Sequence, residues 1–408
     1  MRNREIYMKK LLSFKDKKLI KVITGMRRCG KSTLLDLFEQ RLLNDGVKKE
    51  NIIKMNFESM EFDEITDYKQ LYKYLREKII PDEKNYLILD EIQQVTKWQK
   101  AINSLFAEFD SDIYISGSNA YLLSSELSTL LSGRYVEINM LPLSFKEYLD
   151  FNEFDDAISM EDKFELYLKY GGLPSLTELN KDEETVNTLL TGIYSTVILK
   201  DVIQRNSVKD IVLLEKIVMF LADNIGNITS PNNIGTVFAA EGYIDEGKRK
   251  RNPASRTIDN YIYMLQNAFV FYGVKRYDVK GKQILKTLGK YYIVDTGLRN
   301  TLLGYRDYDY GHILENVVYF ELLRRGYHVS IGKIGDKEVD FIAARQDIKK
   351  YYQVTASMME GIVRERELEP LKQIDDNYEK IVLSMDKTFI RDHNGIRIQN
   401  IIEFLLEY

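Results

Sequence analysis

The sequence predicts an α/β fold in which a parallel sheet with crossover helices comes first and smaller domains follow. Two observations carry this prediction. Short apolar runs rich in β-branched residues alternate with helical patterns from residue 19 to residue 148, and a glycine-rich loop follows the first run. The expected strands are Leu19–Thr24, Ile52–Phe57, Tyr86–Leu89, Ile113–Ser116 and Tyr135–Met140. Because parallel strands need long crossover connections, helices are expected in the gaps between these runs.

Four domains are expected along the chain: an α/β core (1–150), a helical lid (151–208), a third domain (209–305) and a mixed α/β unit (306–408). Gly171, Gly172 and Pro174 predict a tight stop between two helices of the lid. The third domain carries helices, among them Ser255–Gln266, and then two strands around Lys280–Lys282. This order resembles a winged helix.

Composition and charge restrict the function classes. The 408 residues are 44% hydrophobic and 29% charged, and the net charge of −4 provides no general attraction for a polyanion. Any nucleic-acid surface must therefore be local. Cys29 is the only cysteine, which excludes an intramolecular disulfide and fits a reducing cytoplasm. The N-terminus lacks the apolar core of a secretory signal, and the absence of about 18 consecutive apolar residues predicts no membrane span.

The glycine-rich loop predicts a phosphate-binding site. It runs Gly25-Met26-Arg27-Arg28-Cys29-Gly30-Lys31-Ser32, follows an apolar strand and opens a helix that starts at Thr33, as a Walker A motif does. Its glycines allow backbone N–H groups to converge on phosphates, and Lys31 is expected to neutralise the β and γ phosphates. Ser32 is expected to supply a hydroxyl to Mg²⁺. The expected cofactor-binding set thus includes Gly25, Arg28, Cys29, Gly30, Lys31, Ser32 and Thr33.

Two carboxylates follow the apolar strand that ends at Leu89. Asp90 is expected to hold a magnesium-bound water, and Glu91 is expected to polarise the water that attacks the γ phosphate. An intact glutamate at this position makes hydrolysis, and not only binding, the prediction. The alternative is that Asp90 caps the next helix and Glu91 belongs to its first turn.

Polar residues after the next two strands are further candidates. Ser118 and Asn119 end a strand where a neighbouring sheet position could contact the γ phosphate, although a turn with an N-cap is the alternative. Arg134 could stabilise charge in the transition state as an arginine finger, in its own chain or in a neighbour, or could be a surface arginine. The sequence does not decide the oligomeric state.

Five segments together resemble a known family. They are TGMRRCGKSTLL, LILDEIQ, ISGSNAYLLSSELSTLLSGR, LPLSFKEYL and GGLP, and they are similar to prokaryotic AAA-type P-loop ATPases with a C-terminal DUF4143 region. The resemblance covers nearly the whole chain. It implies an additional-strand AAA+ ATPase with a sensor at Ser118 or Asn119 and with Arg134 in a matching position. Preference for ATP over GTP rests on this resemblance, since loop contacts reach phosphates and not the base.

The third domain offers a candidate DNA surface. Ser255 is a suitable N-cap for a helix that resembles a recognition helix, and Arg256 follows it. A basic run lies just upstream, at Lys248, Arg249, Lys250 and Arg251. Such charges could contact phosphates. Packing on the ATPase core or on a protein partner is the alternative reading, because the overall charge is negative.

The last domain resembles a restriction-endonuclease-like fold with a degenerate site. Glu315 lies on a helix, Asp340 ends a strand, and the next strand carries Gln353 and Thr355. Active members of that superfamily have a carboxylate and a lysine at the last two positions, and glutamine is a poor ligand for a hard cation. An active nuclease stays open as an alternative, since a catalytic lysine can migrate between elements and Lys349 and Lys350 lie nearby.

The leading hypothesis is an enzyme: Mg²⁺-dependent ATP hydrolysis changes the conformation of the lid and the third domain and so controls binding of nucleic acid or protein. A non-hydrolysing, ATP-bound scaffold is the first alternative, and Glu91 argues against it. An ATP-regulated DNA nuclease is the second alternative, and it is weakened by Gln353 and Thr355.

Overall fold

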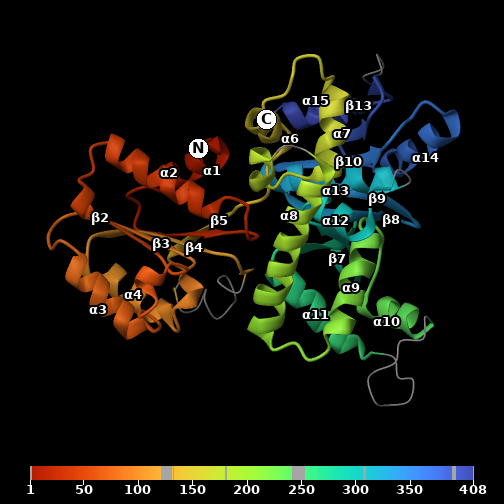
Figure 1. Ribbon diagram of the computed structural model, residues 1–408. Coiled ribbons are helices and arrows are strands. Elements are labelled where there is room, and N and C mark those ends of the chain that lie inside the picture. Colours follow the sequence, from red (N-terminus) through yellow and green to blue (C-terminus); the bar gives the residue numbers. More distant parts are fainter. Residues whose placement is uncertain are drawn as a thin grey trace. The chain divides into compact units, whose positions relative to one another are not determined.

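The computed structural model describes residues 2–120, 131, 133–179, 182–240, 253–306, 309–387 and 392–407. The chain divides into two compact units (Figure 1). Unit 1 comprises Met1–Pro142 with Asn267–Phe269, and unit 2 comprises Leu143–Gln266 with Val270–Tyr408. The division falls earlier than the domain end expected at residue 150. The reason is α6 (Phe145–Phe151), whose Phe145 ring packs 5.0 Å from the Phe164 ring, inside unit 2.

Unit 1 is a five-stranded parallel sheet in the order β2-β3-β4-β1-β5. Its strands are β1 (Ile20–Thr24), β2 (Ile52–Asn56), β3 (Asn85–Asp90), β4 (Ser111–Gly117) and β5 (Tyr135–Asn139). All five lie where the sequence predicted them, with ends shifted by at most two residues. The strand of the glycine-rich loop, β1, and the strand of the two carboxylates, β3, are separated by β4. This is the additional-strand order that the family resemblance implied.

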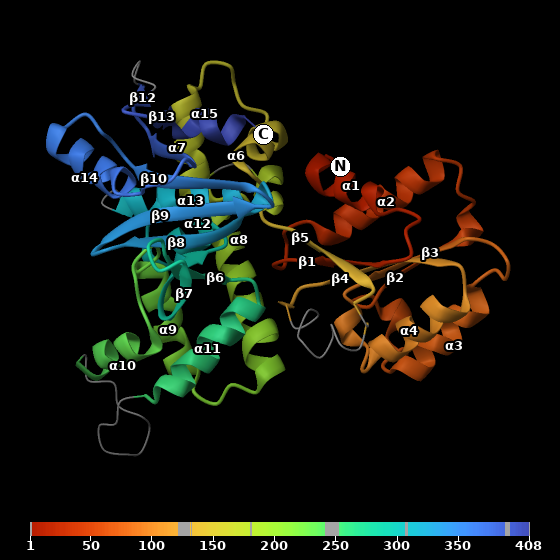
Figure 2. The ribbon, with the colours of Figure 1, turned by 180° about the vertical axis from the view of Figure 1, so that it is seen from behind.

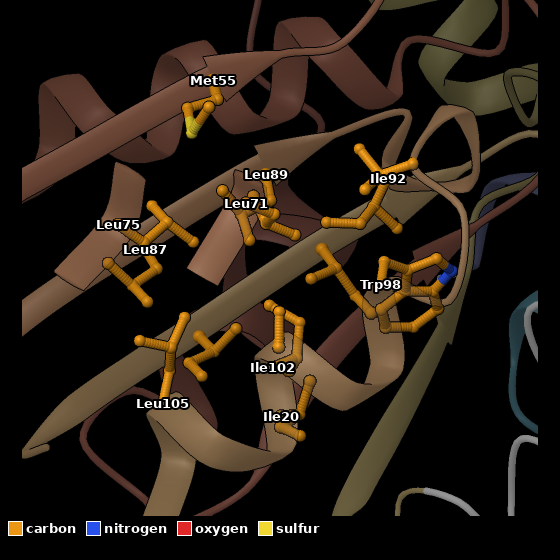
Figure 3. Close-up of a cluster of buried hydrophobic side chains, with 14 of the residues drawn as sticks. Ile20, Met55, Leu71, Leu75, Leu87, Leu89, Ile92, Trp98, Ile102 and Leu105 are labelled. Carbon is orange, nitrogen blue, oxygen red and sulfur yellow. The ribbon is translucent and has the colours of Figure 1, made fainter. Parts of the chain in front are cut away.

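Helices cover both faces of this sheet (Figure 2). They are α1 (Glu5–Ser13), α2 (Lys31–Asn44), α3 (Tyr68–Lys78) and α4 (Trp98–Glu108), with short 3₁₀ turns at Lys49–Asn51, Met60–Phe62 and Ile92–Gln94. Successive residues of a strand point to opposite faces. Accordingly Leu87 and Leu89 of β3 pack with Trp98 and Ile102 of α4, as Figure 3 shows, whereas Ile88 packs on the α1 and α2 side. The strands read as continuous apolar runs because both faces are buried.

Unit 2 begins with helices. After α6 come α7 (Met160–Tyr170), a 3₁₀ turn (Pro174–Glu178), α8 (Glu183–Thr196) and a π-helical segment (Val197–Gln204). The stop expected at Gly171 is present: Gly171 has φ +80°, and a Cβ there would lie 2.1 Å from Asp295 Oδ1. The backbone N–H of Gly172 donates to the Asp295 carboxylate at 2.7 Å. The glycines are therefore needed for the close approach of this carboxylate.

One helix in the described part of the chain, Glu183–Gln204, is long and apolar enough to cross a membrane by length and composition. This is weak evidence, because core helices of soluble proteins pass the same test. The sequence search for an uninterrupted apolar run missed it because polar residues such as Asn187 and Lys200 interrupt it.

The rest of unit 2 is built around an eight-stranded mixed sheet in the order β12-β13-β11-β10-β9-β8-β6-β7. The elements are α9 (Ile211–Asp223), α10 (Pro231–Ala240), α11 (Ser255–Asn267), β6 (Phe271–Asp278), β7 (Gln283–Ile293), α12 (Thr296–Leu303), α13 (Tyr310–Arg324), β8 (His328–Ile334), β9 (Lys337–Arg345), β10 (Ile348–Thr355), α14 (Gly361–Lys372), β11 (Glu379–Ser384), β12 (Asp392–His393), β13 (Ile396–Asn400) and α15 (Ile401–Leu406). The order from α13 to β11 is αβββαβ.

The sheet continues across the domain boundary expected between residues 305 and 306. β6 pairs with β8 in parallel, with Arg276 opposite Ile331. The hairpin expected as a wing, β6 and β7, therefore belongs to the same sheet as the last domain. Periodicity in a sequence tells which residues of a strand share a face, but it does not tell which strands pair.

Candidate nucleotide-binding site

The glycine-rich loop connects β1 to α2, as predicted. Gly25 has φ +145°, and a Cβ on it would lie 2.2 Å from the carbonyl oxygen of Met140, so only glycine fits beside the end of β5. Gly30 has φ +98° and is the N-cap of α2, and no side chain caps this helix. The first N–H groups of α2 therefore lack side-chain acceptors, which suits the binding of an anion.

Lys31 is held by the loop that precedes it. Its ammonium donates to the carbonyl oxygens of Gly25 at 3.1 Å and Met26 at 3.2 Å. It also lies 3.5 Å from Oε1 of Glu91. Ser32, one residue further, is exposed, so its hydroxyl is accessible from the loop side of the site.

Asp90 and Glu91 lie at the carboxyl end of β3. Asp90 accepts a hydrogen bond from the Ser116 hydroxyl and interacts with that of Ser32. Burial raises the pKa of Asp90. For Glu91, burial alone would raise the pKa, but Lys31 and the side chain of Gln93 lower it below its usual value. Glu91 also has φ +54°, a left-handed conformation that is uncommon for a residue with a side chain and is often found at functional sites.

Two serines of the β4 strand end complete this edge of the sheet. Ser116 was not predicted: its oxygen accepts the Glu91 backbone N–H at 3.1 Å while its hydroxyl donates to Asp90. Ser118, a predicted sensor, hydrogen-bonds the Glu91 carboxylate. Asn119, the other sensor candidate, is 3% exposed at the same strand end. Ser118 follows directly after β4 ends at Gly117. The role of Ser116 comes from its place beside Asp90 on the neighbouring strand, for which the sequence gives no local signal.

Arg134 does not join the site of its own chain. Its carbonyl oxygen accepts the N–H of Ile20, so it lies beside the start of β1, whereas the loop follows the end of β1 at Thr24. At about 3.3 Å per residue, the start of β1 and the loop after its end are separated by roughly 15 Å along the strand, which exceeds the reach of an arginine side chain. This placement argues against the same-chain version of the arginine-finger hypothesis.

The other predicted loop residues differ in exposure. Cys29 is buried, and burial raises the pKa of its thiol. Arg28 is exposed and has φ +66°, and Thr33 is exposed on α2. The Cys29 thiol is therefore a packing group beneath the loop, whereas Arg28 and Thr33 border its accessible side.

The candidate DNA surface is described in part. On α11, Ile258, Tyr261, Ile262 and Leu265 are buried and Arg256 is exposed. The expected apolar face thus packs inward, and the opposite face carries the arginine. The basic run Lys248, Arg249, Lys250 and Arg251 lies outside the described residues.

The residues of the expected nuclease-like site come together in unit 2, with a lysine that the sequence reading missed. Lys290 of β7 lies 3.1 Å from Glu315 and 2.6 Å from Glu338, and Asp340 is 3.8 Å away. Gln353 accepts the backbone N–H of Asp340 at 3.4 Å. The expected neighbours Lys349 and Lys350 instead lie near Asp376 and Glu379.

The site in unit 1 fits a nucleotide with its magnesium ion. Ser32 and Asp90 are oxygen donors that already contact one another, as residues of one magnesium site must. The Lys31 ammonium interacts with two neutral carbonyl oxygens and one carboxylate, and it gives up only these interactions when it binds phosphates. These features define the class of protein: a P-loop nucleotide-binding protein with an additional strand between the two nucleotide-binding motifs.

Comparison with known proteins agrees with this class. Residues 17–149 match the family described as AAA domain, so unit 1 is an AAA-type P-loop ATPase domain, a class that binds nucleotide. Residues 161–309 match a domain of unknown function, DUF8612, where the resemblance had implied a DUF4143 region.

The chain belongs to the family of an uncharacterized protein of Haemophilus influenzae, which is 43% identical over 100% of this chain and 99% of that protein. The uncharacterized protein MJ1544 of Methanocaldococcus jannaschii is 29% identical over 91% of this chain and 83% of its own length. Among solved structures, Aeropyrum pernix ORC1 in complex with DNA is 13% identical and covers 74% of this chain and 92% of that chain, with a TM-score of 0.32.

Proposed function

We propose that the chain hydrolyses ATP with Mg²⁺ and uses the hydrolysis cycle to change the conformation of unit 2. The observation that carries the proposal is the meeting of Lys31, Glu91 and Ser118 at one edge of the sheet, with Lys31 only 3.5 Å from Glu91. A scaffold that only bound ATP would not need a buried glutamate beside the loop lysine. Burying such a charge is costly unless it is paired.

Glu91 acts as the group that orients and polarises the attacking water. Its lowered pKa keeps the carboxylate ionised at neutral pH, as accepting a hydrogen bond from water requires. When phosphates bind, Lys31 exchanges the carbonyl oxygens of Gly25 and Met26 for phosphate oxygens. The Glu91 carboxylate then loses its nearest cation, and the Ser118 hydroxyl remains to fix its orientation.

Ser32 and Asp90 are the residues that would hold Mg²⁺, Ser32 directly and Asp90 through a water. The ion supplies neutralisation of the charge that develops on the phosphate oxygens. Ser116 positions the Asp90 carboxylate through its hydroxyl and also accepts the backbone N–H of Glu91, so one side chain holds the Asp90 carboxylate and the Glu91 backbone.

Unit 2 provides the output of the switch. The order α9, α10, α11, β6, β7 supports a winged helix, and the αβββαβ order of the last domain supports a degenerate restriction-endonuclease-like fold. DNA is the candidate partner through Arg256 and the run Lys248–Arg251, and a protein partner is the alternative. The single cysteine favours a cytoplasmic location.

Phosphate release tests this function. Purified chain with ATP and Mg²⁺ is compared with Lys31→Ala and Glu91→Gln, each with and without duplex DNA. Turnover that both variants lose establishes the ATPase, and faster turnover with DNA supports the nucleic-acid partner. If the native chain binds ATP but releases no more phosphate than Glu91→Gln under every condition, the non-hydrolysing scaffold replaces this proposal.

Arg134 is proposed to act on the nucleotide of a neighbouring chain. Its exposed side chain lies at the edge of the sheet opposite the loop of its own chain. The test mixes Arg134→Ala with Lys31→Ala, neither of which turns over alone. Mixed assemblies contain some contacts with an intact Lys31 and an intact Arg134, so turnover returns on mixing. Turnover that stays absent in the mixture, or an Arg134→Ala chain as active as the native chain, contradicts the proposal.

A further inference from the structure

A buried lysine lies among three carboxylates in unit 2. Lys290 projects from β7, and its side chain is 4% exposed. Its ammonium lies 2.6 Å from Oε1 of Glu338, 3.1 Å from Oε2 of Glu315 and 3.8 Å from Oδ1 of Asp340. An ammonium has three N–H donors, and these three acidic groups surround it.

The cluster is closely packed on the side of Glu315. Tyr292, two residues along β7, donates its hydroxyl to Glu315 at 3.2 Å. From another direction the backbone comes close at Gly226, where a Cβ would lie 3.1 Å from Oε2 of Glu315 and 2.9 Å from Nδ1 of His312. On the side of Glu338 and Asp340 the cluster borders a cavity of about 570 Å³, which Gln353 and Glu367 also line. The position between the three carboxylates is therefore filled by the ammonium, and not closed by a lack of space around it.

Several other donors of the nuclease-like arrangement are already in use, whereas Oε2 of Glu338 is buried without a hydrogen-bond partner among the described residues. Oδ2 of Asp340 accepts the backbone N–H of Val354 at 2.8 Å, and the Gln353 amide donates to Glu367 at 3.0 Å. Thr355 donates its hydroxyl to the carbonyl oxygen of Ser357. Among the residues that the structure describes, no group of three or more His, Cys, Asp or Glu side chains is arranged to hold a metal ion.

The ionisation of the acidic groups in the cluster depends on the positive charge of Lys290. Burial alone would raise the pKa of Glu315, but Lys290 holds it below its usual value. Asp340 is different: burial, with the nearby Glu315, raises its pKa well above the usual value. A divalent ion that bound between all three carboxylates would have to displace a buried ammonium from its partners, which carries a large desolvation cost.

We propose that the Lys290 ammonium occupies the place that a divalent cation takes in active restriction-endonuclease-like sites, so that the native chain binds no Mg²⁺ at this cluster. Lys290 then serves as a built-in counter-ion that fixes β7 to α13 and β9. This inference concerns unit 2 and does not depend on ATP hydrolysis in unit 1. It accounts for the acidic residues that remain at Glu315, Glu338 and Asp340 even though the lysine expected at Thr355 is absent.

The test is binding of Mn²⁺ by the full chain, measured by calorimetric titration. A background with Ser32→Ala and Asp90→Asn removes the donors of the nucleotide site. In this background the chain with native Lys290 is expected to bind no Mn²⁺. Lys290→Met, which has a similar length and no charge, is expected to bind one Mn²⁺, and adding Asp340→Asn is expected to abolish it. Lys290→Arg, which keeps the charge, is expected to bind none.

A second variant covers the risk that Lys290→Met does not fold. Lys290→Met with Glu338→Gln removes one negative charge and keeps Glu315 and Asp340. Its melting temperature is expected to rise with Mn²⁺, whereas that of the native chain in the same background is expected to stay constant. If neither lysine variant responds to Mn²⁺ while folded, the inference is wrong.

The opposite result would identify a different role for the lysine. If the chain with native Lys290 binds Mn²⁺ and Asp340→Asn abolishes the binding, the cluster is itself a metal site and the proposal is overturned. Plasmid cleavage that requires Mn²⁺ and is lost in Lys290→Met would then make Lys290 a catalytic lysine that has migrated to β7.

Discussion

Two lysine–carboxylate clusters, one in each unit, differ in how firmly the lysine is held. Lys31 and Lys290 are buried to the same degree, each with a side chain 4% exposed. Lys31 lies 3.5 Å from one carboxylate and otherwise donates to backbone carbonyls. Lys290 is surrounded by three acidic side chains, one of them at 2.6 Å. Burial therefore does not separate the two sites, whereas the number of charged partners does.

The number of charged partners determines which role each lysine can take. Lys31 can exchange neutral carbonyl oxygens for phosphate oxygens at little electrostatic cost. Lys290 would leave buried carboxylates unpaired if it moved, and unpaired buried charge is strongly destabilising. A loosely held lysine suits ligand binding, and a tightly held one suits a structural counter-ion. The following predictions test this contrast.

The largest expected effect is on catalysis in unit 1. Glu91→Gln removes the carboxylate that polarises water while keeping its shape, so phosphate release is expected to fall by about 10²- to 10⁴-fold. ATP binding should persist, because Lys31 and the loop are intact. The measurement is steady-state phosphate release together with nucleotide affinity. Glu50→Gln, an exposed glutamate before β2, is the matched control and should leave the rate unchanged. Equal rates for native and Glu91→Gln chains would remove Glu91 from the mechanism.

The next largest effect is on the stability of unit 2. Lys290→Met leaves the neighbouring acidic groups without their cation, so the free energy of unfolding is expected to fall by about 3–5 kcal/mol. Lys169→Met is the matched control, since Lys169 pairs with Glu183 at the surface and is expected to change stability by about 1 kcal/mol or less. Chemical denaturation measures both. A Lys290→Met effect no larger than the control would show that the cluster does not depend on its lysine.

Asp295 is a buried carboxylate that accepts hydrogen bonds from backbone N–H groups and has no cation beside it among the described residues to lower its pKa. Burial raises its pKa to about 6. The folded-state pKa thus lies above the unfolded value, so its contribution to stability is complete below about pH 4 and is lost as pH rises through about 6. A shift of about two units corresponds to about 3 kcal/mol.

Asp295→Asn cannot ionise, so it removes this pH dependence. The difference in the free energy of unfolding between the native chain and Asp295→Asn should therefore change between about pH 4 and pH 6.5, with the native chain losing stability as pH rises. Denaturation curves at several pH values measure it. Parallel pH profiles for the two chains would show that Asp295 titrates normally.

Much of the unit 1 site was predictable because its signals are local. A strand, a glycine loop and a helix follow one another in 25 residues, and apolar runs buried on both faces identify the other strands. The position of Arg134 was also implied: it precedes its strand, whereas Gly25 follows its own, and parallel strands share one direction. An arginine at the start of β5 therefore belongs to the other edge of the sheet.

Residues brought together by strand pairing were not predictable. Lys290 is one of two lysines in β7, it lies 25 residues before Glu315, and nothing local connects the two. Its role depends on β6 and β7 joining the last sheet, which follows from the pairing of β6 with β8. Ser116 was missed for a similar reason, because its value comes from lying beside Asp90 on the neighbouring strand.

The smallest predicted effect concerns Gly25, where the loop that holds Lys31 comes close to the end of β5. Gly25 and Gly46 both have positive φ, +145° and +88°, but a Cβ on Gly25 would lie 2.2 Å from the Met140 carbonyl oxygen, whereas a Cβ on Gly46 would meet nothing within 4 Å. Alanine strains the backbone at both positions by about 1–3 kcal/mol. Only Gly25→Ala must also move the loop, so it alone is expected to lose ATP affinity. Titration of a fluorescent ATP analogue, with thermal melting of both variants, separates the two effects. Equal loss of affinity in Gly25→Ala and Gly46→Ala would trace the defect to general strain, and the close approach of the loop to β5 would then have no part in nucleotide binding.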